Sequence, residues 1–136
     1  PTTILSAVDI VRQTQVTVIQ HPGKGARAAL QRLMGHDRDF GYVLDSNRRF
    51  LGVVSTDSLQ KLIDEEDGSS DITKAFLPDI IARKGEESMH DILPEVTGYP
   101  CPLPIVDEEG KYLGVISKNQ FLKTLHRSQA DETLSQ

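Results

Sequence analysis

The sequence of 136 residues contains a single cysteine, no long apolar run and no excess of basic residues. One cysteine cannot form an intramolecular disulfide, which is consistent with a reducing compartment. No apolar stretch approaches the ~20 residues of a membrane-spanning helix, and the N-terminus lacks the pattern of a signal peptide. A net charge of −5 argues against a nucleic-acid partner, which would require a basic surface. Because the first residue is Pro1 rather than Met, we expect the chain to be an excised part of a longer protein.

Residue patterns of catalytic and metal sites are also missing. No Gly-x-x-x-x-Gly-Lys-[Ser/Thr] phosphate loop occurs, and no set of nucleophile, base and orienting residue is visible. The four histidines share no metal-ligand spacing with one another or with Cys101. Cys101 lies between two prolines, and we interpret it as a small packed residue rather than a nucleophile, which would need a nearby histidine. We therefore expect neither an enzyme nor a metal site in this chain.

What the sequence does contain is an internal repeat with a constant offset. The segment 45–55, DSNRRFLGVVS, returns as 107–117, DEEGKYLGVIS. Identical residues recur in this register at Asp45/Asp107, Leu51/Leu113, Gly52/Gly114, Val53/Val115, Ser55/Ser117 and Lys61/Lys123. We expect the same register to extend upstream without a gap. Because two copies are too few for a solenoid, they should pack on each other as a pseudo-twofold pair.

Each copy has the apolar pattern of a short helix, a strand, a helix, a β-hairpin and a closing helix. In the first copy we predict a helix over 4–11 with Thr2 or Thr3 as N-cap, a strand over 16–19, a helix over 24–34, hairpin strands over 42–44 and 50–54, and a helix over 56–64 capped by Ser55. In the second copy we predict a strand over 80–81, a helix over 86–96 that Pro94 ends or bends, hairpin strands over 103–106 and 112–116, and a helix over 118–126.

Several residues in these strands and turns have structural explanations. Gly52 and Gly114 lie inside strands, where glycine weakens packing, so we expect the other copy or a bound ligand to approach their backbone closely. Asp45 and Asp107 each open a hairpin turn, which is reason enough for an aspartate at both positions. Tyr42 is interpreted as a core residue of a strand rather than a platform for a stacked base.

The order of elements and the Gly-Val-Val-Ser sequence at 52–55 resemble a CBS domain, and two such units in tandem resemble a Bateman module. The resemblance extends further, to the C-terminal CBS pair of glycine betaine/L-proline ABC importer ATP-binding subunits, in segments 23–30, 41–43, 52–59, 100–107 and 114–118. It covers nearly the whole chain. It implies an α+β fold of two βαββα repeats, with CBS domains at 1–68 and 69–127. Residues 128–136 have no apolar period, so we expect them to form a polar, frayed C-terminal tail.

The resemblance also implies that clefts between the two copies bind a small ligand, an adenine nucleotide or cyclic di-AMP. The implied ligand-binding residues are Val18, Ile19, Tyr42, Val54, Ser55, Thr56, Asp57, Ser58, Ile80, Ile81, Cys101, Pro102, Ile116, Ser117, Lys118, Asn119 and Gln120. The family places an aspartate three residues after the Ser or Thr that ends the strand, where its carboxylate accepts hydrogen bonds from both ribose hydroxyls. Ser58 and Gln120 occupy those positions here, and Asp57 and Asn119 lie one residue earlier, about 100° round the helix. We therefore predict weak or absent binding of AMP and ATP.

Two functions follow from the resemblance. The first is a regulatory CBS pair of an osmoprotectant (glycine betaine/L-proline) importer ATPase, which senses a small ligand or ionic strength. The second is a ligand-free dimerisation module of the same ATPase subunit. Both imply a homodimer that acts with the parent ATPase domain and the membrane subunits of the transporter, in the cytoplasm at the inner face of the cell membrane.

An anionic membrane surface is a further partner that the resemblance implies. Basic residues at 48–49, 83–84 and 118–127 are scattered and outnumbered by acids, so we interpret each group as an ordinary solvated face. Lys118 is the exception, because it directly follows Ser117 at the end of a strand.

Overall fold

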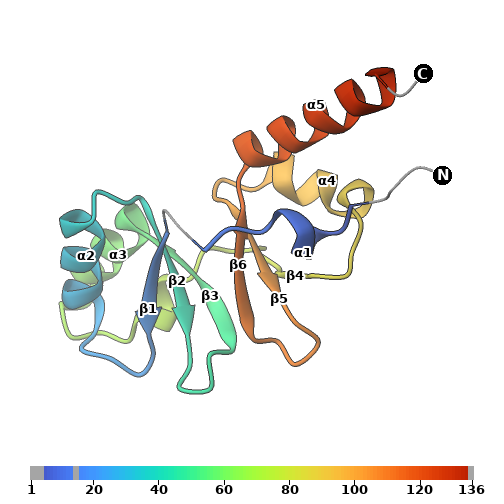
Figure 1. The fold of residues 1–136 in the computed structure, drawn as a ribbon. Helices are drawn as coiled ribbons and strands as arrows, with labels where there is room; N and C mark the ends of the chain where they lie inside the picture. The colour runs from blue at the N-terminus through green and yellow to red at the C-terminus, as the bar shows by residue number, and fades with distance from the viewer. Residues whose placement is uncertain (1–4, 14–15, 135–136) are drawn as a thin grey trace.

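A computed structural model of the protein describes residues 5–13 and 16–134 (Figure 1). In chain order the elements are α1 (Ala7–Ile10), β1 (Thr17–Gln20), α2 (Ala26–Gly35), β2 (Phe40–Leu44), β3 (Phe50–Ser55), α3 (Thr56–Glu65), the 3₁₀ helix η1 (Ile72–Ala75), β4 (Arg83–Lys84), α4 (Met89–Gly98), β5 (Leu103–Val106), β6 (Tyr112–Ile116) and α5 (Lys118–Leu134). Two three-stranded sheets have the orders β1-β2-β3 and β4-β5-β6, and each combines a parallel pair with an antiparallel hairpin. The predicted α+β fold of two βαββα units is confirmed.

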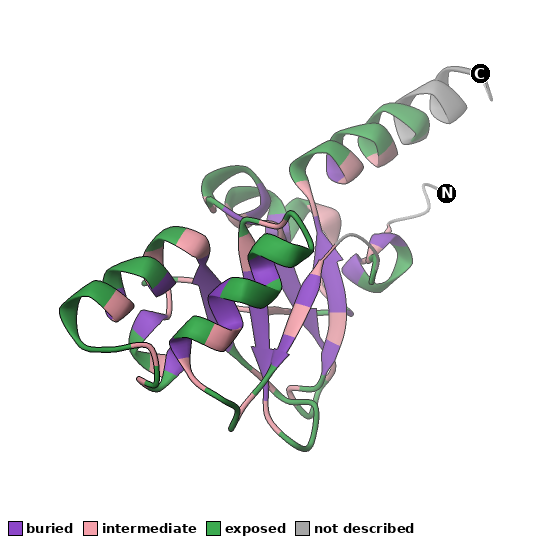
Figure 2. Cartoon of the chain, turned by 90° about the vertical axis from the view of Figure 1, so that its left-hand side faces the viewer, coloured by how far each residue is buried: buried purple, intermediate pink, exposed green. Residues whose placement is uncertain are grey.

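The two sheets lie in the middle of the molecule, with helices on the outer side of each (Figure 1). Side chains of β2 alternate between the two sides, because Val43 packs in the core with α2 and α3, while Tyr42 and Leu44 face the other sheet. The inter-sheet cluster consists of Tyr42, Leu44, Val53, Cys101, Tyr112 and Val115. Figure 2 shows buried strands behind helices whose outward faces are exposed. Each half therefore buries an apolar sheet face against the other half.

A pseudo-twofold axis passes through the bridge between Arg49 and Lys111, two residues that occupy the same place in the repeat. The hydrogen bonds beside this bridge are exchanged by the same rotation: Phe50 N donates to Gly110 O at 3.0 Å, and Tyr112 N donates to Arg48 O at 2.9 Å. In the register of the repeat, Phe50 corresponds to Tyr112 and Arg48 corresponds to Gly110. Backbone hydrogen bonds thus join the two copies as the pseudo-twofold pair that the repeat predicts.

The register of the repeat holds in the hairpins but fails upstream of them. The hairpin register aligns Ala26, the first residue of α2, with Ser88, yet α4 begins at Met89. It also aligns Ile19 with Ile81. However, Ile19 pairs with Val43 of β2, and the residue that pairs with the equivalent Ile105 of β5 is Arg83. The ungapped register is therefore wrong, and so is the strand predicted over 80–81. The residues that pair with β5 are Arg83 and Lys84, so the strand follows the two isoleucines at 80 and 81.

The segment that precedes each unit packs on the other unit. Arg12 N donates to Val115 O of β6 at 2.9 Å, and Val115 N donates to Arg12 O at 2.8 Å. In the corresponding place, Leu77 N donates to Val53 O of β3 at 2.8 Å. As a result, α1 buries apolar side chains in the core of the second half, and η1 does so in the core of the first. The domain boundary at residue 68 stays a prediction, but each half completes its core with a segment from across that boundary.

These crossing segments explain the two strand glycines. A Cβ at Gly114 would lie 2.5 Å from Arg12 O, and a Cβ at Gly52 would lie 2.7 Å from the ring of Phe76. The predicted close approach is confirmed at both positions, and in both cases the approaching segment comes from the other copy.

Local signals for turns and helix starts predict the structure well. Ser55 caps α3, since its Oγ accepts a hydrogen bond from Ser58 N at 2.9 Å. Asp45 Oδ1 accepts from two backbone N–H groups of its turn at 2.8 and 2.9 Å, and Asp107 Oδ1 does the same at the same two distances. Thr2 and Thr3, the predicted caps of the first helix, lie outside the described residues.

Two predictions about helix ends are corrected. The tail predicted at 128–136 is helical as far as Leu134, because no glycine or proline after Lys118 interrupts α5. Pro94 does not end α4, which continues to Gly98, and a bend at Pro94 stays a prediction. Over the described residues, no helix combines the length and the apolarity that a membrane crossing requires.

Candidate functional site

The first implied ligand site lies where β3 enters α3. Ser55 and Ser58 form a reciprocal cap, in which Ser58 Oγ accepts from Ser55 N at 2.8 Å and Ser55 Oγ accepts from Ser58 N. Ser58 thereby satisfies a backbone donor at the helix start, a role for this side chain that needs no ligand. Thr56 is partly exposed and Asp57 is exposed in the first turn, where a carboxylate favours the helix dipole. The Ser-x-x-Ser spacing before an apolar helical pattern is a sequence signal from which this reciprocal cap could have been predicted.

The corresponding site lies where β6 enters α5. Ser117 Oγ accepts a hydrogen bond from Gln120 N at 3.1 Å, so this serine also caps its helix. Lys118 and Asn119 are exposed in the first turn of α5. Lys118 forms no ion pair with a residue that the structure describes. At both strand-to-helix junctions a serine therefore caps the helix, and polar side chains follow it in the first turn.

The remaining implied residues are divided among three places. Val18, Tyr42, Ile80 and Cys101 meet in the inter-sheet cluster. Ile19 and Val54 belong to the first core and Ile116 to the second, so these three side chains pack against helices rather than toward the other sheet. Ile81 is exposed, and its backbone N donates to Tyr99 Oη at 3.1 Å. Their assignment as ligand-binding residues stays a prediction.

Buried polar groups tie the two halves together at Tyr42. Its Oη donates to Pro102 O at 2.6 Å, and its ring centroid lies 6.2 Å from that of Tyr112. Burial raises the pKa of the Tyr42 hydroxyl far above its ordinary value, and burial raises the pKa of Tyr112 to about 12. Burial likewise raises the pKa of the Cys101 thiol. A thiol held in its protonated form is a poor nucleophile, which agrees with the interpretation of Cys101 as a packed residue.

A cavity of about 690 Å³ lies at the opposite end of the first sheet from Ser55. Ser55 pairs with Phe40 at the start of β2, whereas Gln20 pairs with Leu44 at its end, where the cavity opens. The cavity is bounded by β1, the loop 21–25, the first turns of α2 and residues 69–72. Among the implied ligand-binding residues only Val18 and Ile19 line it. Sequence reasoning missed this cavity, because residues 69–72 join it from a distant part of the chain.

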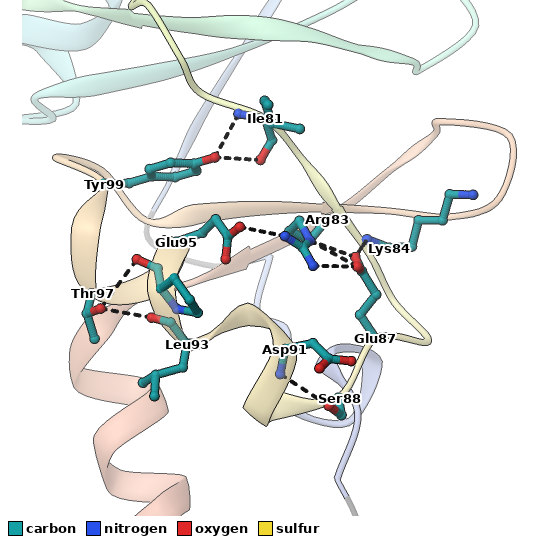
Figure 3. Close-up of polar contacts among 11 residues, drawn as sticks. Ile81, Arg83, Lys84, Glu87, Ser88, Asp91, Leu93, Glu95, Thr97 and Tyr99 are labelled. Carbon is teal, nitrogen blue, oxygen red and sulfur yellow. Dashed lines mark hydrogen bonds and ion pairs between the residues drawn. The ribbon is translucent and has the colours of Figure 1, made fainter.

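An ionic cluster of Arg83, Glu87 and Glu95 lies in the second half (Figure 3). Arg83 Nη2 lies 2.7 Å from Glu87 Oε1, and Arg83 also pairs with Glu95. Glu87 Oε2 accepts from Lys84 N at 2.6 Å. The hydrogen bond from Arg83 is the main cause that lowers the pKa of Glu87 below its ordinary 4.5.

This cluster makes stability depend on pH. Because the pKa of Glu87 is lower in the folded state, its contribution is complete above pH 4.5 and is lost as the pH falls through the folded-state pKa. We expect Glu87→Gln to lower the free energy of unfolding at neutral pH, and the difference from the original protein to disappear in acid. Urea unfolding at a series of pH values measures this. Glu86→Gln, a change at the exposed neighbour, should show no such difference, and a pH-independent effect of Glu87→Gln would contradict the account.

No cluster of three or more His, Cys, Asp or Glu side chains among residues 5–13 and 16–134 is arranged to hold a metal ion. The features that the structure offers for a binding site are the two capped helix starts, the apolar layer between the sheets and the cavity at the end of β1.

Comparison with protein families and curated proteins gives two findings. Residues 84–127 match the family model of the CBS domain. The chain is also 38% identical over 125 residues to the glycine betaine/proline betaine transport system ATP-binding protein ProV of Salmonella typhimurium. That match covers 91% of this chain and 30% of ProV, so the chain spans less than a third of the length of the curated relatives it matches.

Solved structures share the fold over almost the whole chain. CbpB in complex with c-di-AMP has a TM-score of 0.80 and 17% identity, and the match covers 98% of this chain and 93% of CbpB. The CBS-pair protein CBSX2 of Arabidopsis thaliana, in complex with AMP, has a TM-score of 0.71 and 22% identity, with 92% and 98% covered. At these identities the likeness concerns the fold alone.

Proposed function

The chain is a tandem pair of CBS domains, and we propose that it is the regulatory module of the ATPase subunit of an osmoprotectant importer. The observation that carries the proposal is the similarity to ProV over 91% of the chain. The parent protein would then contain the ATPase domain, act with membrane subunits and lie at the inner face of the cell membrane. Glycine betaine and related compounds are the proposed cargo of the parent transporter, not ligands of this module.

The way the two halves are joined supports regulation by a change in their arrangement. Each half completes its core with a segment from the other half, and the hydrogen bonds at the pseudo-twofold axis join the two hairpins. A ligand that prefers one arrangement of the halves shifts the parent between two states without any chemistry of its own. A differential interaction of about 1–3 kcal/mol is enough to change an affinity about 5- to 150-fold.

We propose the two capped helix starts, at Ser55 and Ser117, as the places that receive the phosphates of a nucleotide ligand. The start of a helix favours an anion, because its backbone dipoles are aligned. CbpB and CBSX2, which share the fold, are described in complex with c-di-AMP and AMP. An adenine nucleotide or a cyclic dinucleotide is accordingly the proposed ligand class, and ionic strength acting on exposed charges is the alternative signal.

Binding of AMP and ATP should be weak, because Ser58 replaces the carboxylate that would hold the ribose. We expect Ser58→Asp to strengthen AMP binding about ten- to a hundredfold, since a hydrogen bond to a charged group contributes about 1.5–3 kcal/mol. The new carboxylate can still accept from Ser55 N. Thermal melting with AMP, ATP and cyclic di-AMP measures this, because a ligand of the native state raises its apparent stability. Ser46→Asp, in an exposed turn, is the control, and micromolar ATP binding by the original protein would contradict the prediction.

A dimerisation module without a ligand is the second candidate function. Four apolar side chains on the outer helices favour it, because they are 38% to 67% exposed: Met34, Leu93, Leu122 and Leu125. Leu93, Leu122 and Leu125 lie on α4 and α5, which contact each other, and we propose that this surface receives a second copy. Sedimentation would show a dimer under this proposal, and a monomer at high micromolar concentration would count against it. A melting temperature that no nucleotide changes, together with a dimer, would favour this candidate over the sensor.

A further inference from the structure

The cavity at the loop 21–25 is separate from the two proposed nucleotide sites. It lies at the end of β1, whereas Ser55 stands at the opposite end of the same sheet. Its volume of about 690 Å³ falls within the range of about 300–1,000 Å³ that small-molecule sites occupy. Small residues leave this space open, since Ala28 and Ala29 present only methyl groups to it.

Basic side chains surround the cavity in a chain whose net charge is negative. Lys24 and Arg32 line it, and neither forms an ion pair with a described residue. Arg32 Nε donates to Val18 O at 3.1 Å, which holds the guanidinium against β1 and leaves its other N–H groups available. The lining also contains Asp71, but its carboxylate is already occupied by His21 at 3.1 Å and by Thr73 N at 2.9 Å. A hydrogen-bonded carboxylate keeps its charge, but Lys24 and Arg32 together outweigh Asp71, so the net charge of the lining is positive.

The start of α2 does not supply the anion site, because its first donors are occupied. Ala26 N donates to Ser70 O at 2.9 Å, and Arg27 N donates to Gly68 O at 2.8 Å. An anion in this cavity must therefore be held by the side chains of Lys24 and Arg32 rather than by the helix start.

The second half provides an internal comparison, because the equivalent positions carry paired charges there. Arg83 takes the sheet position that Ile19 has in the first half. Glu95 takes the position of Arg32, since α2 and α4 have equal lengths and each of these residues is the seventh of its helix. In the second half Arg83 pairs with both Glu95 and Glu87, so each charged side chain of the cluster has a partner of opposite charge within the protein (Figure 3). In the first half the position of Glu95 is held by Arg32, which has no acidic partner among the described residues and borders the open cavity.

We propose that this cavity is a further ligand site, which binds a small anion with a phosphate or carboxylate group on a compact apolar body. The anionic group pairs with Lys24 and Arg32, and the apolar body packs between Ala28 and Ala29 on one side and Ile72 on the other. Because residues 69–72 form the opposite wall, an occupant bridges α2 and the connector between the two halves. The site thus provides a second input to the arrangement of the two halves. This last step rests on the proposed regulatory function, whereas binding at the cavity does not.

Amide chemical shifts of the ¹⁵N-labelled 136-residue chain, recorded by NMR, test this proposal with three probes: phenyl phosphate, benzoate and the neutral benzyl alcohol. We expect saturable shifts of the amides of residues 21, 23–29 and 69–72 with an anionic probe, and none with benzyl alcohol. Lys24→Ala and Arg32→Ala should each weaken binding about tenfold or more. Ala28→Leu fills the cavity without altering charge and should abolish binding. Arg49→Ala removes an exposed arginine on the first hairpin and should leave binding unchanged.

The relative affinity of the two anionic probes identifies the anionic group of the natural ligand. Tighter binding of phenyl phosphate indicates a phosphate ester, and tighter binding of benzoate indicates a carboxylate. The absence of saturable shifts with both anionic probes would overturn the proposal. So would shifts confined to the helix starts at Ser55 and Ser117, or an affinity that Lys24→Ala, Arg32→Ala and Ala28→Leu leave unchanged. The backbone spectrum of each variant, compared with that of the original protein, shows that the fold is retained.

Discussion

Replacing Tyr42 by alanine is expected to lower the free energy of unfolding by about 3–5 kcal/mol, the cost of removing a fully buried aromatic side chain. Tyr42 is 1% exposed and belongs to the cluster between the two sheets. The ring packs near Tyr112, and the hydroxyl donates to Pro102 O across the two halves. Its loss therefore leaves a cavity where the halves meet and an acceptor without its donor.

Tyr42→Phe separates these two contributions, because it keeps the ring and removes only the hydrogen bond. A smaller loss of about 0.5–1.5 kcal/mol is expected for this variant. Urea unfolding of both variants, followed by circular dichroism, measures the difference. If Tyr42→Ala cost less than about 1 kcal/mol, far below the range for a buried aromatic residue, the inter-sheet layer would not be the tightly packed contact that the structure shows.

Gly114→Ala is the second substitution with a large expected effect. Gly114 has a φ of 143°, which disfavours any side chain, and an added Cβ would lie 2.5 Å from Arg12 O. That oxygen is fixed by its hydrogen bond from Val115 N, so the crossing segment must move for the methyl group to fit. Backbone strain and overpacking together should cost about 2–5 kcal/mol.

Gly52→Ala is the matched control for this substitution, because Gly52 holds the same place in the first copy. There the added Cβ would meet the ring of Phe76 rather than a backbone atom, and a side chain can move more easily. We therefore expect Gly52→Ala to cost less than Gly114→Ala in the same unfolding experiment. Equal costs would show that neither the φ of Gly114 nor its contact with a backbone atom makes this position the stricter of the two.

The parts of the fold that depend on short-range signals could be predicted from the sequence. The hairpin turns follow from Asp45 and Asp107, whose side chains accept from nearby backbone N–H groups. The cap at Ser55 follows from a serine before an apolar helical pattern. The two strand glycines indicated a close approach, and the repeat identified the other copy as a source of the approaching segment.

The features that failed depend on contacts between distant residues. Ile80 and Ile81 have high strand propensity, but hydrogen bonds to β5 place the strand at Arg83 and Lys84. A charged residue is acceptable at 83 because Glu87 and Glu95 pair with it, and the sequence does not show that pairing. The cavity escaped prediction for the same reason, since its walls are brought together by the packing of residues 69–72 on α2.

The helical end of the chain was missed because apolar periodicity was the criterion. Residues 128–134 lack such a pattern, yet they contain no glycine or proline, so an established helix continues through them.

At the candidate site, the serine at position 58 was interpreted only as a missing aspartate. The structure shows that it also caps α3, which explains the residue independently of any ligand.

Uptake of glycine betaine as a function of external salt, by the full-length transporter with and without this region, tests the central proposal most directly. If the chain is a regulatory module, its deletion should leave an active transporter whose uptake no longer changes with salt, or changes at a different salt concentration. Ser58→Asp in the full-length protein provides a milder perturbation of one helix start. Unchanged uptake with an unchanged salt dependence after deletion would contradict the proposed regulatory function.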